Sequence, residues 1–211
     1  MDNTWYKEDA FYQIWCRSFK DGNGDGIGDL YGVLDKLDYI KSLGVDGIWF
    51  SPIYPSPNAD YGYDISDYKN ISPDYGDLDL FKKGFLTRLI REGLRFLWIW
   101  WSTTPRMSTI GSRRAKMSVD NPYHDYYFWR KGKGKNGKRP PNNWLSTFEG
   151  GAWEYDKGLD EYYLHVFAKK QPDLNMDNPK VREEVKSIMR FWLDMGVDGF
   201  REDVITFISK K

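Results

Sequence analysis

The sequence has few of the residues that build disulfides, membrane spans or targeting segments. Cys16 is the one cysteine among 211 residues, which excludes an intrachain disulfide. No apolar run approaches the length that spans a bilayer, and the start, "MDNTWYKEDAF", lacks the basic and apolar regions of a secretory signal. The formal net charge is zero, so charge balance gives no general reason to expect nucleic acid or a membrane as partner. We therefore expect a cytoplasmic protein.

Aromatic residues are abundant, in contrast. The chain has 10 Trp, 15 Tyr and 12 Phe, together 18% of its residues. Aromatic rings stack on the apolar faces of sugars, and they also fill cores. Composition alone does not separate these two uses.

The charge is unevenly distributed along the chain. Residues 82–118 contain nine Lys or Arg and one acid, Glu92, whereas the rest of the chain has 22 basic and 30 acidic residues (31 − 9 and 31 − 1). A patch for nucleic acid or another anionic surface would explain this excess, but the basic residues follow no helical or strand period. The tryptophans of "FLWIWW" (residues 96–101) would suit a buried helix or a makeshift third strand.

Apolar spacing predicts alternating strands and helices. "YQIWCRSF" (residues 12–19) and "VDGIWFSP" (residues 45–52) are typical of buried strands. Between them, helical spacing predicts one helix that ends at Gly44. A second helix is predicted to begin at Pro179, with Asn178 as its cap, and to be stopped by Gly196. The apolar positions are Leu30, Val33, Leu34, Leu37 and Ile40 in the first helix, and Val181, Val185, Ile188 and Trp192 in the second.

An internal repeat indicates the fold class. "LGVDGIWFSP" (residues 43–52) and "MGVDGFREDV" (residues 195–204) both place a glycine stop, Val-Asp-Gly and an apolar strand after a helix. A repeated helix–strand unit predicts an α/β protein with a parallel sheet, of which a (β/α)8 barrel is one closed form. Catalytic residues of such barrels lie where the strands end, near Pro52 and Asp203.

Residues 120–170 break this pattern, with a polar turn-rich loop and three short aromatic-rich runs. We predict a small inserted lobe after the third strand of the amino-terminal half of a barrel. The expected domains are residues 1–103 (first part of the barrel), 104–175 (the lobe) and 176–211 (a return to the barrel with its third helix and fourth strand).

A glycine-rich acidic loop is a candidate metal site. "DGNGDGIGD" places Asp21, Asn23, Asp25 and Asp29 at alternate positions, and the Ile27 carbonyl is a further candidate ligand. The spacing matches the first nine positions of an EF-hand loop but lacks the closing acid. Hard oxygen ligands suit Ca²⁺ or Mg²⁺. An acidic surface turn is the alternative interpretation.

Two further motifs contain candidate catalytic and binding residues. In "SPNADYGYDISDY" (residues 56–68), Asp60 and Tyr63 follow a strand and are able to bind a hydroxyl-rich ligand, although both are ordinary loop residues. In "GFREDV" (residues 199–204), Arg201 and Asp203 alternate and so share one face of a strand. Arginine favours the charged form of a neighbouring carboxylate, as a nucleophile requires. A structural buried ion pair is equally consistent with the spacing.

Together these motifs, with "NPYHDYYFWR" (residues 121–130) and "QPDLN" (residues 171–175), resemble the α-amylase superfamily, the family 13 glycoside hydrolases. Within it they are most similar to the oligo-1,6-glucosidase and α-glucosidase branch. The motifs span nearly the whole chain in family order. The resemblance implies a retaining mechanism on oligosaccharides, with no nucleic-acid or membrane partner and a monomeric full-length relative.

The resemblance also implies roles for individual residues. Asp203 corresponds to the nucleophile, and Arg201 holds it. Asp60 and Tyr63 contact the terminal glucose. Phe148 and Phe167 are aromatic walls of that subsite, and Val204 matches the valine associated with α-1,6 preference. The Asp21–Asp29 loop matches the Ca²⁺ site of the branch; no organic cofactor is expected.

The resemblance leaves the activity of this chain open. In the family, the acid/base Glu and a third Asp follow later strands, so we expect the 211 residues alone to be inactive. An α-1,4-glucosidase or a trehalose-6-phosphate hydrolase are alternative activities. A non-catalytic partner subunit of the superfamily is an alternative of another class.

The sequence of the basic segment does not resemble the sequence that the family has at this position, and the genetic code offers a reason. Suppose that the true reading frame starts one nucleotide earlier, so that each true codon joins the last base of one codon of this sequence to the first two bases of the next. The codons of Trp98 and Ile99 then give Asp, and those of Trp100 and Trp101 give Val. Residues 86–90 can then be read as "VDEAH", which the family carries. We therefore predict a frameshift that enters near Phe85 and is corrected by about Ser118.

Overall fold

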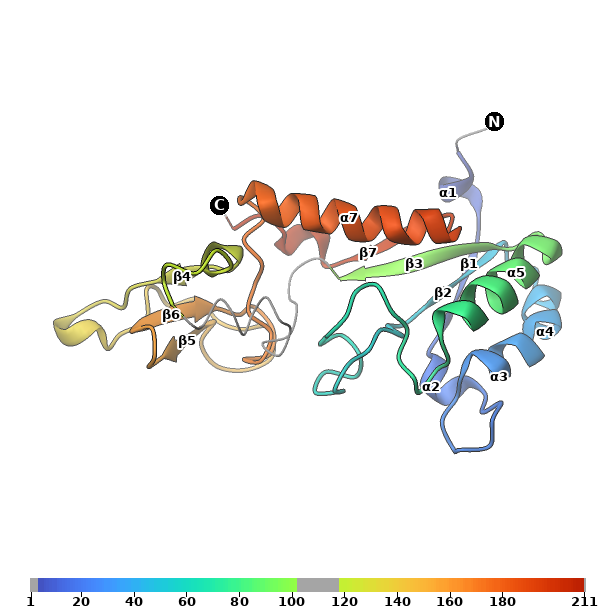
Figure 1. The fold of residues 1–211 in the computed structure, drawn as a ribbon, viewed down its shortest axis with the longest axis horizontal. Coiled ribbons are helices and arrows are strands. Elements are labelled where there is room, and N and C mark those ends of the chain that lie inside the picture. Colours follow the sequence, from blue (N-terminus) through green and yellow to red (C-terminus); the bar gives the residue numbers. More distant parts are fainter. Residues whose placement is uncertain (1–3, 102–117, 211) are drawn as a thin grey trace. The chain divides into compact units, whose positions relative to one another are not determined.

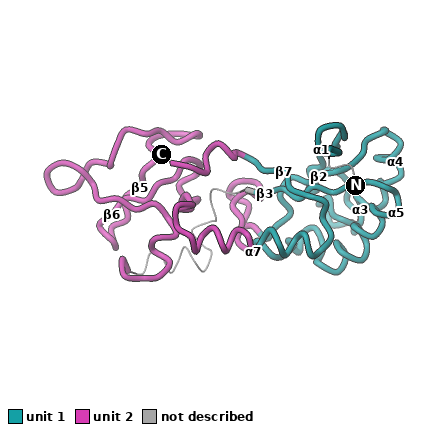
Figure 2. The backbone as a smooth tube through the Cα atoms, turned by 90° about the horizontal axis from the view of Figure 1, so that it is seen from above, with its two compact units in different colours: residues 1–55, 68–100, 188–203 teal, residues 56–67, 101–187, 204–211 magenta. Residues whose placement is uncertain are grey.

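The computed structural model describes residues 4–101 and 118–210 (Figure 1). The chain divides into two compact units, coloured separately in Figure 2. The first comprises residues 1–55, 68–100 and 188–203, and the second comprises residues 56–67, 101–187 and 204–211. Because these units are sets of contacting residues and not chain-order segments, the predicted domain boundaries stay predictions.

The first unit is built on a four-stranded sheet with the order β1-β2-β3-β7. β1 pairs with β2, and β2 with β3, in parallel. Gly47 in β2 permits this pairing, since a Cβ there would lie 2.4 Å from Cε1 of Phe11. The strands are β1 (Phe11–Ile14), β2 (Gly47–Phe50), β3 (Arg95–Trp101) and β7 (Gly199–Asp203).

Helices connect these strands, which gives the expected α/β pattern (Figure 1). The π-helix η1 leads directly into α5 before β3, and α7 precedes β7. The helices are α1 (Trp5–Glu8), which precedes β1, and then α2 (Cys16–Phe19), α3 (Leu30–Asp35), α4 (Leu37–Ser42), η1 (Leu80–Leu86), α5 (Thr87–Glu92) and α7 (Pro179–Met195).

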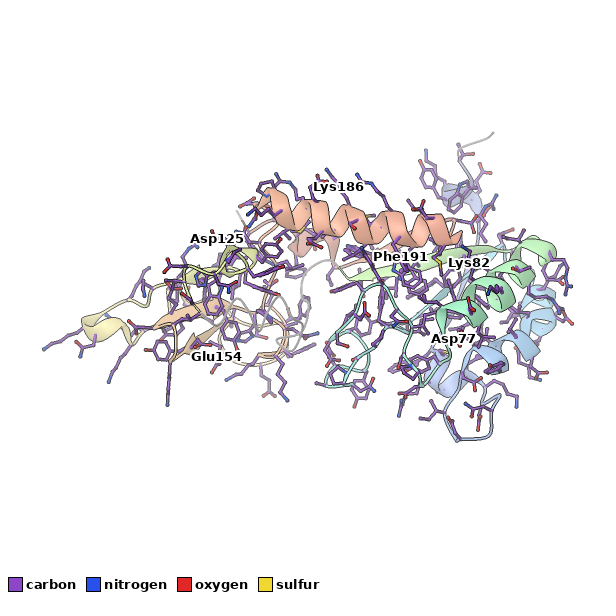
Figure 3. All side chains as sticks on the ribbon, viewed as in Figure 1. Asp77, Lys82, Asp125, Glu154, Lys186 and Phe191 are labelled. Carbon is purple, nitrogen blue, oxygen red and sulfur yellow. The ribbon has the colours of Figure 1, made fainter. Side chains whose placement is uncertain are left out.

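Helix α7 confirms the prediction from local sequence signals. It begins at Pro179, and the Asn178 side chain accepts a hydrogen bond from the Lys180 amide at 2.9 Å. Gly196 follows with a φ of 110°. In Figure 3, Lys186 and Phe191 project from different sides of the helix, in line with its exposed and half-buried faces.

Two predicted elements were wrong in their bounds. The strand predicted at residues 12–19 ends at Ile14, and Cys16–Phe19 forms α2, because a short apolar run suits a strand and a helix equally. The single helix predicted before Gly44 is two helices. Lys36, with φ of −103° and ψ of 6°, separates α3 from α4, and its amide bonds back to Val33 at 3.0 Å in a tightened last turn.

The core of the first unit is aromatic. Trp98 of β3 stacks on Trp192 of α7, with ring centroids 3.6 Å apart and an interplanar angle of 19°. The Trp98 indole donates to the Tyr54 hydroxyl, which donates to the Ile99 carbonyl at 3.0 Å. The tryptophans of "FLWIWW", which suited either a buried helix or a third strand, therefore belong to a strand of the sheet.

The second unit contains the inserted lobe. Its three-stranded sheet has the order β4-β6-β5, with β4 (Trp129–Arg130), β6 (Glu161–Leu164) and β5 (Trp153–Asp156) all antiparallel to their neighbours. Trp129 of β4 and Tyr163 of β6 form a small buried core with Tyr127. The aromatic-rich runs predicted as strands thus fold together. Single 3-10 turns are η2 (His124–Tyr126), η3 (Lys135–Gly137) and η4 (Ile205–Phe207).

Candidate active site

The Arg201–Asp203 pair lies on β7 of the first unit. The two residues alternate along the strand, and the Arg201 guanidinium lies 2.7 Å from Asp203 Oδ2. The other side of the guanidinium is covered, since its Cζ lies 4.8 Å from the ring centroid of Trp49 on β2. About a fifth of the Asp203 side chain (20%) is exposed. The arrangement presents one carboxylate, fixed by a positive partner, at the end of strand β7.

The residue after Asp203 has a strained backbone. Val204 has φ of 47° and ψ of 35°, a left-handed conformation that is costly for a β-branched residue. Such outliers persist where the surrounding structure enforces them, and they cluster at functional sites. The predicted specificity residue therefore occupies a conformation that its own side chain disfavours.

Asp60 and Tyr63 share one turn in the second unit. The Tyr63 amide donates to the Asp60 carbonyl at 2.9 Å. Asp64, which has no exposed surface, holds the turn together: its carboxylate accepts from the Asp60 and Ala59 amides at 3.1 Å and from the Ser56 hydroxyl at 2.7 Å. A buried carboxylate thus fixes the backbone that carries Asp60.

Gln171 of the "QPDLN" motif contacts Asp60 from 111 residues away. Its Nε2 donates to Asp60 Oδ2 at 3.0 Å, while its Oε1 accepts from the Ala168 amide at 3.2 Å. Burial raises the pKa of Asp60, the bond from Gln171 partly offsets this rise, and the Asp64 carboxylate adds to it. These residues line a cavity of about 260 Å³, together with Ala59, Ala168, Lys169 and Lys170.

Phe148 and Phe167, the two predicted aromatic walls of a subsite, pack against each other. Their ring centroids are 5.9 Å apart at an interplanar angle of 64°. Phe148 is 55% exposed, whereas Phe167 is 4% exposed and also packs on Phe207 of η4, with centroids 5.7 Å apart. Phe148 is therefore the one of the two whose face is open to a ligand.

The acidic loop carries the oxygens of the predicted metal site. The amides of Gly26 and Gly24 donate to the Asp21 carboxylate at 2.8 and 2.6 Å, and they lower the pKa of Asp21. Asp29 is buried and caps α3 by accepting from the Gly32 amide at 2.7 Å. Asp25 Oδ1 accepts from the Ile27 amide at 2.8 Å.

These oxygens suit a hard cation in chemistry, since a carboxylate oxygen that accepts an amide retains a second lone pair. However, nowhere in residues 4–101 and 118–210 do three or more Asp, Glu, His or Cys side chains gather as a metal site. Binding would therefore depend on the Asn23 side chain and the Ile27 carbonyl as well. The metal site stays a prediction.

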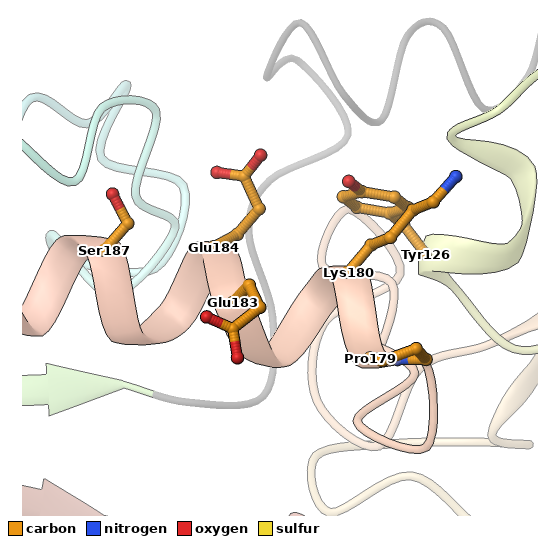
Figure 4. Close-up of a pocket in the computed structure, with 6 residues that line it drawn as sticks. All are labelled: Tyr126, Pro179, Lys180, Glu183, Glu184 and Ser187. Carbon is orange, nitrogen blue, oxygen red and sulfur yellow. The ribbon is translucent and has the colours of Figure 1, made fainter.

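Another cavity is unrelated to the predicted residues. A depression of about 480 Å³ lies along the first half of α7, and Figure 4 shows its lining. Its described lining residues are Tyr126, Pro179, Lys180, Glu183, Glu184 and Ser187, none of which is a predicted site residue. Within the described part of the chain, no helix has the length and apolarity needed to cross a membrane.

Comparison with known families decides what this arrangement belongs to. The family model "Alpha amylase, catalytic domain" matches residues 13–211. The chain belongs to the α-amylase family, glycoside hydrolase family 13. Its sheet and helices are accordingly the amino-terminal half of the (β/α)8 barrel of that family, with the lobe inserted after the third strand, as predicted.

Relatives of this family 13 chain include several glucosidases. It is 54% identical over 213 residues to oligo-1,6-glucosidase of Parageobacillus thermoglucosidasius, covering 100% of this chain and 37% of the relative. It is 51% identical to the Bacillus cereus oligo-1,6-glucosidase over 214 residues, with the same shares of both chains. The chain thus spans somewhat more than a third, 37%, of the length of these relatives.

Solved structures support the same placement. The trehalulose synthase MutB from Pseudomonas mesoacidophila MX-45 superposes with a TM-score of 0.93 at 47% identity, covering 98% of this chain and 36% of that one. A MutB mutant in complex with the substrate sucrose superposes equally, with a TM-score of 0.93 at 46% identity over 100% of this chain and 37% of MutB.

The structure adds residues that sequence reasoning missed. Gln171 lies in a motif used for the resemblance, but nothing in its spacing indicates a bond to Asp60. Asp64 lies in another motif, yet an aspartate in a polar loop gives no sign of being fully buried. Trp49 belongs to a predicted strand, and the residue that it faces on β7 depends on sheet order, which the sequence does not specify.

Proposed function

We propose that the chain carries the amino-terminal part of the active site of a retaining α-glucosidase. The substrate is glucose at the non-reducing end of short α-glucans, with α-1,6 linkages preferred. The observation that carries the proposal is the Arg201–Asp203 pair at the end of a barrel strand. It occurs in a family 13 chain that is 54% identical to an oligo-1,6-glucosidase.

The proposed chemistry gives each of these residues a role. In a retaining mechanism one carboxylate attacks the anomeric carbon to form a glycosyl-enzyme, while a second carboxyl group protonates the leaving oxygen; water then releases the sugar. Asp203 is the attacking carboxylate, and Arg201 fixes its orientation. Asp60 accepts hydrogen bonds from sugar hydroxyls, with Gln171 and Asp64 holding it in place. The open face of Phe148 suits the apolar face of the glucose ring.

The 211 residues alone are expected to bind sugar without hydrolysing it. The two carboxylates of a retaining site stand about 5 Å apart. By resemblance, this chain holds the nucleophile but not the acid/base Glu. Purified protein should therefore show no turnover of an aryl α-glucoside. Detectable turnover that is abolished in Asp203→Asn would overturn this expectation.

Sugar binding tests the site itself. Isomaltose, added during an NMR titration, should shift the resonances around Asp60, and Asp60→Asn should weaken its binding. Asp125→Asn, at an exposed position in the same unit, is the matched control. Tighter binding of maltose or trehalose 6-phosphate than of isomaltose would instead favour the α-1,4-glucosidase or the trehalose-6-phosphate hydrolase. Absence of binding by all three sugars would favour the non-catalytic partner subunit.

We also propose that the Asp21–Asp29 loop binds Ca²⁺, with Mg²⁺ as the alternative. The candidate ligands are the side chains of Asp21, Asn23, Asp25 and Asp29 and the carbonyl of Ile27. Calorimetry should detect one cation per chain, and Asp21→Asn should weaken uptake. The exposed Asp120→Asn serves as control. Equal uptake by wild type and Asp21→Asn would exclude this loop as the site.

A further inference from the structure

The loop that carries Phe148 is a tight excursion next to the end of β6. The Ser146 amide donates to the Gly150 carbonyl at 2.9 Å, and Leu145 forms an antiparallel bridge with Gly151. Phe148 lies at the tip between them. The Thr147 amide donates to the Val166 carbonyl at 2.7 Å, which docks the loop on the segment that continues from β6. A backbone hydrogen bond therefore docks the loop without any help from a side chain.

The Ser146 hydroxyl makes a second connection between these two segments. Its oxygen accepts from the Phe148 amide at 3.2 Å and donates to the Phe167 carbonyl at 2.9 Å, with the Val166 carbonyl as a more distant acceptor at 3.3 Å. A hydroxyl has one proton to donate and two lone pairs to accept with, so a single side chain can satisfy both partners. The backbones of Phe148 and Phe167 thus meet at one oxygen atom.

This oxygen sets the relation between the two rings. Phe167 is fixed by burial, and its carbonyl also lies 3.0 Å from His165 Nδ1. Phe148 is 55% exposed, so burial alone does not hold its ring. The Phe148 amide is bonded to the hydroxyl that also bonds the Phe167 carbonyl, and the two rings lie 5.9 Å apart.

We propose that Ser146 is a positioning residue for the sugar site, because its hydroxyl couples Phe148 to Phe167 and so holds the aromatic wall against which the glucose ring packs. The proposal rests on the proposed function. It assigns Ser146 no contact with sugar, since its hydroxyl is engaged by protein groups on both sides.

Three variants of the 211-residue chain test the coupling. Ser146→Ala removes the hydroxyl, and Ser146→Thr retains it. Thr147→Ala removes a hydroxyl from the exposed neighbour while keeping the backbone bond that docks the loop. Each variant is measured for the nuclear Overhauser contact between the Phe148 and Phe167 rings and for isomaltose affinity.

Loss of one such hydrogen bond should weaken isomaltose binding about five- to tenfold in Ser146→Ala, with loss of the ring contact. Ser146→Thr should retain the ring contact and the isomaltose affinity of the wild type, and Thr147→Ala should change neither of them. Retention of the ring contact and of full affinity in Ser146→Ala would overturn the proposal, as would equal losses in Thr147→Ala. If wild type binds no isomaltose, the proposed sugar site fails, and the ring contact alone still decides whether Ser146 couples the two phenylalanines.

Discussion

Asp173 is a carboxylate with no exposed surface, so its partners determine what it contributes to stability. Its Oδ1 lies 2.9 Å from Nζ of Lys210, and its Oδ2 accepts from the Val166 amide at 2.6 Å. Burial raises the pKa of Asp173, while Lys210 acts in the opposite direction. The Lys210 side chain is itself only 8% exposed, so the pair is shielded from salt and water.

The Lys210→Met substitution should therefore destabilise the second unit strongly at neutral pH. Removing one partner of a buried ion pair costs about 3–5 kcal/mol, because the other charge stays buried without compensation. The folded-state pKa of Asp173 is already raised and should rise further in the variant. A group with a raised acid pKa favours folding below its unfolded-state pKa and loses that contribution as pH rises through the folded value. The loss should thus shrink when urea unfolding is repeated near pH 4.

Two further variants control this prediction. Asp173→Asn combined with Lys210→Met removes both charges and should recover much of the lost stability at neutral pH. Lys170→Met, at an exposed position, should have little effect. The same loss for Lys210→Met at both pH values would contradict an electrostatic origin.

At the scale of elements, β3 shows how packing makes a strand from a segment with no clear period. Its residues Phe96 and Trp98 are buried between neighbouring elements, and Trp98 contacts Trp192 of α7. The preceding η1 is a π-helix, whose backbone hydrogen bonds span five residues where those of an α-helix span four. Apolar bulk is thus sufficient to fill the third-strand position.

Trp98→Ala should test how much this contact contributes. Truncation of a buried Trp typically costs about 3–5 kcal/mol, through lost transfer free energy and the cavity left behind. It also leaves the buried Tyr54 hydroxyl without its donor. Urea unfolding of the variant should show a correspondingly lower midpoint. Ile90→Ala, at a position that is 70% exposed, should change the free energy of unfolding by about 0.5 kcal/mol or less; equal losses in both would mean that β3 is not part of a packed core.

The elements also show what local sequence can specify. Helix α7 could be predicted to the residue, because Asn178, Pro179 and Gly196 act on adjacent backbone groups. The break at Lys36 could not, since a lysine within a helical pattern carries no stop signal. In the site, the alternation of Arg201 and Asp203 predicted their shared face. The contact between Gln171 and Asp60 could not be predicted, because it joins residues far apart in the sequence.

At the scale of the whole molecule, the basic segment at residues 82–118 stands apart from the acidic remainder. Its first part, up to Trp101, forms η1, α5 and β3, and its Lys82 is exposed (Figure 3). The cationic residues beyond β3 lie outside the described residues, as do residues 102–117, about half of the predicted frameshift segment. The frameshift therefore stays a prediction, and the fold is compatible with it because strand formation depends on apolar bulk more than on the identity of each residue.

Resequencing the codons for Lys82 to Ser118 should reveal one missing or extra base near Phe85 and a compensating change by Ser118. In the corrected frame, the codon that overlaps those of Trp98 and Ile99 encodes Asp, and the codon that overlaps those of Trp100 and Trp101 encodes Val. Acidic residues would return to the segment, so the isoelectric point should fall below the 6.7 of the printed chain. Tryptic peptides of the protein from its own cells, identified by mass spectrometry, would then contain the corrected text. A peptide carrying "FLWIWW" would show that the printed frame is translated, and the tryptophan-rich β3 would then be a genuine strand of this protein.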